Sequence, residues 1–215
     1  MKKGDIIKFG KYRQIWAHSA TPIEWLVLDV KENEALLISL HALNCRSYHD
    51  ERVNVTWRGC DLRKWLNDDF IHLAFSRDEV KEIKVSEQEC YIKDRIFCLS
   101  IDEAKQYFNS DNARLCKPTD YIKGIVYVYD NGCCDWWLRS PGGGYPCSAA
   151  CVSKIDGSIS SNWVNGFKVN GVFSHAYVGV RPALRIILKP RVNSTRVNSK
   201  FLQFFYSYFR LHKKK

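Results

Sequence analysis

The chain lacks most features that mark membrane, zinc-binding and secreted proteins. No run of about 18 apolar residues occurs, which excludes a membrane-spanning helix. The nine cysteines never take a C-x-x-C spacing, and no closely spaced histidine pair accompanies them, so a zinc site is not expected. The first residues lack the apolar region of a secretory signal, which predicts reduced thiols and a cytoplasmic location. A phage-particle or cell-surface location, reached by another route, stays open.

Acidic residues are absent from the end of the chain. Asp156 is the last acidic residue, whereas residues 185–215 hold nine of the 33 basic ones. Residues 1–184 therefore carry 24 basic and 23 acidic side chains and account for only +1 of the total charge of +10. Nucleic-acid binding leaves a basic patch on the folded part of a protein, so we expect no specific nucleic-acid site.

Patterns of apolar residues predict strands first and helices after them. Residues 5–9, 23–30 and 35–40 alternate as strands do, and a polar turn at 31–34 joins the last two into a hairpin. Helical spacing then recurs at Leu62, Trp65, Leu66, Phe70 and Leu73. Ser76 and Ser100 each precede a glutamate by three residues, the pattern of a capping box, which predicts short helices at about 77–83 and 101–108.

The composition changes between Gly142 and Gly179. Of these 38 residues, 22 are Gly, Ser, Asn, Tyr, Phe, Trp or His, and only three are charged. Asp156-Gly157 between two alternating stretches predicts a hairpin with a two-residue turn. Aromatic side chains supply rigid contact area and small polar ones adapt to a partner, a mixture typical of antibody binding surfaces.

We therefore expect residues 143–177 to carry a binding surface. Its expected contact residues are the polar and aromatic side chains Tyr145, Ser153, Ser158, Ser160, Asn162, Trp163, Asn165, Phe167, Asn170, Phe173, His175 and Tyr177. The ligand is left open between a protein, a peptide and a glycan. Calcium-dependent sugar binding is disfavoured because Asp156 is the only carboxylate in the segment, and we expect no cofactor.

Six further side chains are assigned to the interior of the protein. Trp25, Trp65, Trp136 and Trp137 are expected in the core, since aromatic residues dominate buried area. Arg139 and Arg181 are expected to be buried or half-buried, with backbone carbonyls or a carboxylate accepting their hydrogen bonds.

An ordered series of motifs resembles a bacterial domain family of unknown function. The series includes PIEW at 22–25, LRKWLN at 62–67, WWLRSPG at 136–142 and GVRPAL at 179–184. Its closing part is similar in layout to the formylglycine-generating-enzyme type of C-type lectin fold. The resemblance implies an α+β, C-type-lectin-like domain with a twisted antiparallel sheet and flanking helices, over residues 1–188.

The same resemblance implies two alternative functions. Some proteins of this fold are variable receptors of diversity-generating retroelements. Residues 143–177 lie where the variable segment of those receptors would lie. This position favours a non-enzymatic ligand-binding module. The alternative is a copper-dependent oxidase of the formylglycine-generating type that uses Cys147 and Cys151. Their C-x₃-C spacing is one residue shorter than in those enzymes, and in a regular strand it separates the two positions by about 13 Å.

Residues 189–215 depart from the resemblance and form a predicted basic aromatic tail. Phe201, Phe204, Phe205 and Tyr208 recur at helical spacing, and three lysines end the chain. Docking of this segment on the domain is one expectation. The other is weak, salt-dependent contact with anionic surfaces, because each basic residue near an anionic membrane contributes about 1 kcal/mol.

Overall fold

Two five-stranded sheets dominate the computed structural model. It describes residues 1–16, 19–51, 53–143, 148–164, 167–169, 172–174 and 178–188, and within residues 162–174 only the backbone. The first sheet has the order β1-β2-β3-β14-β7, and its strands are all antiparallel. Its strands are β1 (Ile6–Tyr12), β2 (Thr21–Lys31), β3 (Glu34–Ser39), β7 (Ile96–Phe97) and β14 (Ala183–Ile187). The predicted hairpin is confirmed as β2 and β3, which pair from Trp25 with Ser39 to Lys31 with Glu34.

The second sheet has the order β10-β9-β8-β13-β4. Its strands are β4 (Asn44–Cys45), β8 (Trp136–Pro141), β9 (Ser148–Val152), β10 (Ile159–Val164) and β13 (Gly179–Val180). Only β13 and β8 run parallel; the other pairs are antiparallel. Two small hairpins accompany the large sheets: β5 (Ser86–Gln88) with β6 (Ile92–Asp94), and β11 (Phe167–Val169) with β12 (Val172–Ser174).

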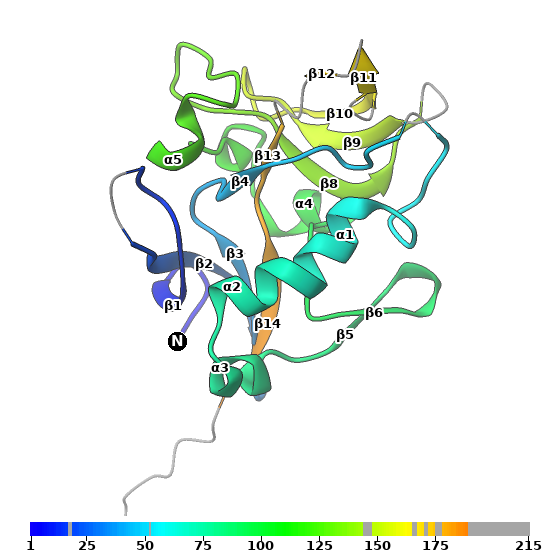
Figure 1. The fold of residues 1–215 in the computed structure, drawn as a ribbon. Coiled ribbons are helices and arrows are strands. Elements are labelled where there is room, and N and C mark those ends of the chain that lie inside the picture. The colour runs from blue at the N-terminus through cyan, green and yellow to red at the C-terminus, as the bar shows by residue number, and fades with distance from the viewer. Residues whose placement is uncertain are drawn as a thin grey trace, which may run out of the picture.

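Two chain segments pass from one large sheet to the other. Residues 34–45 supply β3 to the first sheet and β4 to the second, while residues 179–187 supply β13 and β14. Backbone hydrogen bonds from Leu43 to Val180 and from Ser39 to Pro182, both 2.9 Å, hold the segments together between the sheets. β13 and β14 follow one another through the centre of the molecule, coloured orange in Figure 1.

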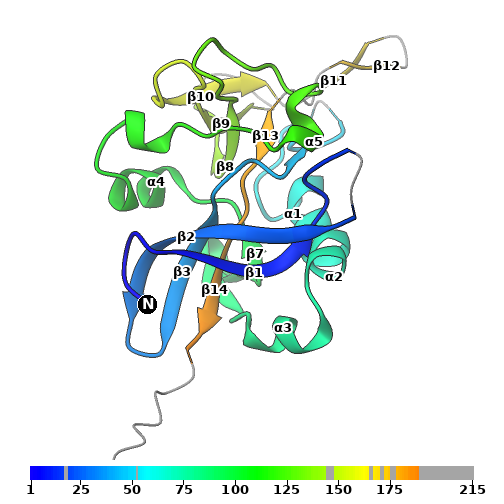
Figure 2. The same ribbon diagram turned by 90° about the vertical axis from the view of Figure 1, so that its left-hand side faces the viewer.

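Short helices flank the sheets on two sides, with α4 on one side and α1 and α2 on the other (Figure 2). They are α1 (Asp61–Trp65), α2 (Ile71–Ala74), α3 (Arg77–Glu82), α4 (Ile101–Tyr107) and α5 (Asp120–Lys123). Both predicted capping boxes are confirmed. The Ser76 hydroxyl accepts from the Glu79 amide at 3.3 Å and the Ser100 hydroxyl accepts from the Glu103 amide at 3.1 Å, so each helix begins at its expected residue.

A π-helical turn, η1 (Leu66–Phe70), separates α1 from α2 and changes the face that is buried. Leu66 and Phe70 are buried as expected, but Leu73 is 66% exposed, and Ala74 is buried in its place. A π turn holds more residues than the 3.6 of an α-helical turn, so the apolar stripe moves on by one position. The expectation that Leu73 continues the stripe is wrong for this reason.

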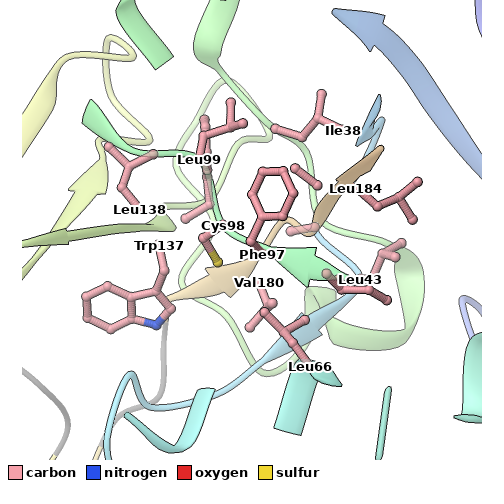
Figure 3. Packing of buried hydrophobic residues seen from close by; sticks show 14 of the residues in the cluster. Ile38, Leu43, Leu66, Phe97, Cys98, Leu99, Trp137, Leu138, Val180 and Leu184 are labelled. Carbon is pink, nitrogen blue, oxygen red and sulfur yellow. The ribbon is translucent and has the colours of Figure 1, made fainter. Parts of the chain in front are cut away.

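The core fills the space between the two sheets and the helices. Phe97, Leu99, Trp137, Val180 and Leu184 lie close together there, from elements that are far apart in the sequence (Figure 3). The four tryptophans assigned to the interior are all buried, which confirms that prediction. The fold is a mixed α+β fold, mostly sheet with a few short helices. No helix in the described part of the chain is long and apolar enough to cross a bilayer.

The last described residues remain attached to the first sheet. The Leu188 amide donates to the Asn33 carbonyl at 2.6 Å, directly after β14. Residues 189–215 lie outside the described residues, so the division into a domain at 1–188 and a tail stays a prediction.

Candidate functional site

The segment expected to bind a ligand begins and ends at neighbouring strands. It follows β8 and precedes β13, and these two strands pair in parallel at Trp136 and Gly179. The Gly179 amide also donates to the Asp135 carbonyl at 2.7 Å. A Cβ atom at Gly179 would come within 2.8 Å of the Cβ of Ala42, so only glycine fits this close approach. The two ends of the segment are therefore held side by side in one sheet.

Two buried tryptophans fix the strand that starts the segment. The indole nitrogen of Trp136 donates to the carbonyl of Arg114 at 3.0 Å, and that of Trp137 donates to the carbonyl of Arg46 at 2.8 Å. Both polar groups are thus satisfied inside the core, where an unpaired donor would be costly. Their partners lie outside residues 143–177, so these two bonds anchor β8 in addition to its pairing with β9, which belongs to the segment.

Arg139, in the middle of β8, is buried and forms an ion-pair network with two glutamates. Its guanidinium donates to both carboxylate oxygens of Glu89 at 2.7 and 2.9 Å, to the Cys98 carbonyl at 3.0 Å, and to Glu103. The Tyr48 hydroxyl donates to the carbonyl of Arg139 itself at 2.8 Å. This bidentate arrangement ties β8 to α4 and to the β5–β6 hairpin. The prediction that Arg139 is buried with its donors satisfied is confirmed.

Electrostatic shifts in this network favour the charged forms. Burial alone would lower the pKa of Arg139, but the hydrogen bonds and negative charges of Glu89 and Glu103 raise it. Burial would likewise raise the pKa of the Glu89 carboxyl, yet its hydrogen bonds and charge interaction with Arg139 lower it. Both shifts favour the charged pair of Arg139 and Glu89, and the network acts as a structural clamp.

Arg181 fixes the other end of the segment in a similar way. It is buried, and its Nε atom donates to the Ser39 carbonyl at 2.9 Å. Its guanidinium carbon lies 5.0 Å from the ring centroid of Trp136 and 5.5 Å from that of Phe108. These contacts connect the residue after β13 to β3 and β8. The prediction of an interior role for Arg181 is confirmed.

Part of the segment itself belongs to the core rather than to a surface. All five residues of β9 (Ser148–Val152) are buried, and β9 lies between β8 and β10. The expected binding surface over the whole of residues 143–177 is therefore interrupted by an interior strand. A buried strand of this kind has no exposed face, so its sequence does not alternate in polarity.

The predicted hairpin at Asp156-Gly157 is present, but its turn is longer than expected. β9 and β10 pair at Val152 and Ile159, and the Ser153 amide donates to the Ser158 carbonyl at 2.8 Å. Gly157 has a φ of 77°, which favours glycine, and its carbonyl accepts from the Arg114 Nε at 2.9 Å. The turn spans residues 153–158, because Gly157 alone supplies a left-handed residue, whereas a two-residue type I′ turn requires two.

The structure describes the side chains of three expected contact residues. Ser153, Ser158 and Ser160 are half-buried around the β9–β10 turn and on β10. For four more, Asn162, Trp163, Phe167 and Phe173, only the backbone is described, in β10, β11 and β12. The remaining five, Tyr145, Asn165, Asn170, His175 and Tyr177, lie outside the described residues. Their predicted roles stay predictions.

A tyrosine-bearing loop beside the hairpin turn was missed from the sequence. The Asn131 side-chain amide donates to the carbonyls of Lys154 and Ile155 at 2.8 and 3.2 Å, and the Lys154 ammonium lies 4.8 Å from the ring centroid of Tyr127. Tyr127 is 62% exposed, and Tyr129 and Ile155 are exposed as well. The alternation of exposed tyrosines with inward-facing valines at 126 and 128 was the available signal. These residues extend the polar and aromatic surface beyond residue 143.

The surroundings of Cys151 weigh against the oxidase alternative. Cys151 is fully buried in β9, across from Trp137 and Ser160, and burial raises the pKa of its thiol far above the usual value. A nucleophilic cysteine needs the thiolate form and access to its substrate, and a fully buried thiol disfavours both. Cys147 lies outside the described residues, so the distance between the two sulfurs is not tested. Nowhere in the described part of the chain do three His, Cys, Asp or Glu side chains gather as metal ligands would.

Comparison with known proteins identifies one family. No curated protein and no solved structure matches the chain. A family model matches residues 32–188, from the turn between β2 and β3 to the end of β14, and so includes both strands that bracket the candidate site. Since this is well over half of the chain, the protein belongs to the family described as Domain of unknown function (DUF6273).

Proposed function

We propose that the chain is a non-enzymatic ligand-binding module with a C-type-lectin-like fold. Its binding surface is carried by the parts of residues 143–177 that lie outside β9, together with the loop that holds Tyr127 and Tyr129. The ligand is a protein, a peptide or a glycan. The module needs no cofactor, because its surface offers contact area and hydrogen bonds rather than a reactive group.

The observation that carries this proposal is that both bracketing strands have buried anchors outside residues 143–177, in addition to the pairing of β8 with β9. β8 is held by Arg46, Arg114, Glu89 and Glu103, and Arg181 after β13 is held by Ser39. None of these partners belongs to residues 143–177. A segment between two such strands can change its exposed side chains without loss of the fold, which suits a site that recognises a partner.

The chemistry of the described surface supports recognition rather than catalysis. Exposed Tyr127, Tyr129 and Ile155 adjoin the half-buried hydroxyls of Ser153 and Ser158. Tyrosine offers a large amphipathic contact area with little loss of conformational entropy, and serine adapts its hydrogen bonds to the partner.

Diversification of this surface is part of the proposal. A variable receptor needs a framework that tolerates changes in the exposed residues, and the anchoring of β8 and β13 meets that need. The genomic neighbourhood tests this point. A reverse transcriptase gene and an adenine-rich template copy of the codons for about 136–181 would support diversification, and their absence would leave an invariant binding domain.

Alanine at Trp163, Tyr177 or Tyr127 should weaken ligand binding without unfolding the protein. We expect a loss of about 1–3 kcal/mol of binding free energy for each, as is usual for aromatic anchors in an interface. The measurement is binding of the full chain to printed arrays of glycans and peptides, followed by titration of the bound ligands in solution. Circular dichroism of each variant shows whether the fold is kept.

Tyr91→Ala is the matched control for these variants. Tyr91 is 85% exposed at the tip of the β5–β6 hairpin, far along the chain from the proposed surface. Its replacement should leave array binding unchanged. Equal binding by all four variants would contradict the proposed function. So would the absence, from both arrays, of any ligand whose binding depends on Trp163, Tyr177 and Tyr127. Unfolding of the Trp163 and Tyr177 variants would instead place those residues in the core.

A further inference from the structure

A cavity outside residues 143–177 lies between β4 and α1. Its volume is about 280 Å³, and its walls include Arg46, Ser47, Asp50, Asp61, Leu62 and Trp65. Pockets for small molecules generally range upward from about 300 Å³, so this cavity fits a ligand of only a few heavy atoms. None of its lining residues has been given a role in the proposed surface.

Arg46 supplies a cation to this cavity that the protein does not neutralise. Its guanidinium carbon lies 4.6 Å from the ring centroid of Trp65, so the planar group is held against the indole. Within the described residues the guanidinium forms no hydrogen bond and no ion pair. A planar guanidinium presents donors in a fork that matches a carboxylate, and here that fork is unused.

Asp61 does not neutralise Arg46, because the Asp61 carboxylate already has other partners. One carboxylate oxygen accepts from the Asp50 amide at 3.0 Å and lies 2.5 Å from the His49 Nδ1. The other oxygen accepts from the Lys64 ammonium at 3.1 Å. Burial would raise the pKa of this carboxyl, but these hydrogen bonds and the nearby positive charges lower it. The carboxylate of Asp61 is thus already paired with groups of the protein itself.

Asp50 supplies an anion on the same cavity. Its side chain is exposed, and in the described part of the chain its carboxylate has neither an ion-pair partner nor a hydrogen-bond donor. Two opposite charges therefore line one small cavity without pairing to each other. A ligand with a single charge would compensate only one of them, whereas a zwitterion compensates both.

We propose that this cavity binds a free α-amino acid. Arg46 holds the α-carboxylate through paired hydrogen bonds, and Asp50 holds the α-ammonium group. Leu62 and the indole of Trp65 provide apolar contact for an aliphatic side chain. The site adjoins the framework of the domain, since Trp137 donates to the Arg46 carbonyl and Cys45 pairs with Gly179, but it does not require the surface of residues 143–177.

Titration of the full chain with three related probes tests this proposal. L-leucine carries both charges, N-acetyl-L-leucine only the carboxylate, and L-leucinamide only the ammonium group. The readout is the NMR signal of the Trp65 indole NH. We expect saturable shifts with leucine and at least tenfold weaker binding of each single-charge probe.

Two variants assign the charges to their residues. Arg46→Gln should abolish binding of leucine and of N-acetyl-L-leucine, while Asp50→Asn should reduce leucine binding to the level of N-acetyl-L-leucine. Arg13→Gln is the matched control, because Arg13 also stacks on aromatic rings, those of Trp16 and Tyr121, and lies outside the cavity.

The comparison of the three probes on the unaltered chain keeps the test valid if a variant fails to fold. No saturable shift with leucine, or equal binding of leucine and N-acetyl-L-leucine, would overturn the proposal. Retention of leucine binding in a folded Arg46→Gln variant would overturn it too. None of these results depends on whether the arrays identify a ligand for the surface of residues 143–177.

Discussion

Replacing Arg139 with alanine should lower the free energy of unfolding by about 3–5 kcal/mol, as expected when one partner of a buried ion pair is removed. Arg139 is only 5% exposed, and it compensates Glu103, whose side chain is 19% exposed. Without the guanidinium, the Glu103 carboxylate and the Cys98 carbonyl lose a donor inside the protein. Urea unfolding followed by tryptophan fluorescence measures the loss.

Glu89→Gln provides the control for this prediction. The Glu89 side chain is 59% exposed, so water screens its pairing with Arg139, and the expected loss is at most about 1 kcal/mol. Equal losses for the two variants, or an Arg139→Ala protein as stable as the unaltered chain, would show that the network does not hold β8 in place.

The same network predicts the direction of a pH effect. The pKa of Glu89 is lowered in the folded protein, so its contribution to stability is fully present above the unfolded pKa of about 4.3. That contribution is lost as the pH falls through the folded pKa. The Arg139→Ala variant lacks the cause of the shift, and its stability should therefore fall less steeply between neutral pH and acid.

Replacing Trp136 with alanine should lower the free energy of unfolding by about 3–5 kcal/mol, as much as the Arg139→Ala change. Trp136 is fully buried, its indole donates to the Arg114 carbonyl, and its ring lies beside the guanidinium of Arg181. Alanine leaves a cavity between β8 and Phe108, at the point where β8 pairs with Gly179. Thermal unfolding monitored by circular dichroism checks the expected loss.

Trp136→Phe separates the packing of the ring from its hydrogen bond. Phenylalanine keeps most of the buried aromatic area but removes the donor and the second ring of the indole, so we expect a loss of about 1–3 kcal/mol. A phenylalanine variant as unstable as the alanine variant would mean that the hydrogen bond, and not the filled volume, dominates at this position.

Local signals in the sequence predicted local structure well. The β2–β3 hairpin follows from alternation around a polar turn, and the helices after Ser76 and Ser100 follow from capping boxes whose bonds are made within three residues. The π turn at Leu66–Phe70 left no comparable pattern. It moves the buried face of the helix on by one residue, and for that reason Leu73 was placed on the wrong face.

Pairings between distant segments could not be derived from the sequence. β14 pairs with β3 across about 150 positions, and β13 pairs with both β4 and β8. No local pattern specifies such partners, because each strand is equally able to pair with any other of matching polarity. The motif arginines at 139 and 181 were nevertheless placed correctly in the interior.

The burial of β9 within the candidate segment could not be derived from the sequence either. Composition alone marked residues 143–177, but it could not show that β9 lies between two other strands and is buried. Nor could it show that the loop with Tyr127 lies against the β9–β10 turn, since that contact depends on the Asn131 side chain and on Lys154.

Saturation mutagenesis of the displayed full chain, sorted for resistance to protease, tests the central claim most directly. The claim is that β8, β13 and their buried partners determine the fold, while the side chains of the proposed binding surface are free to vary. We predict that most substitutions at Ser153, Ser158 and Tyr127 retain resistance, whereas those at Trp136 and Arg139 lose it. Surface positions as intolerant as Trp136 and Arg139 would contradict the account.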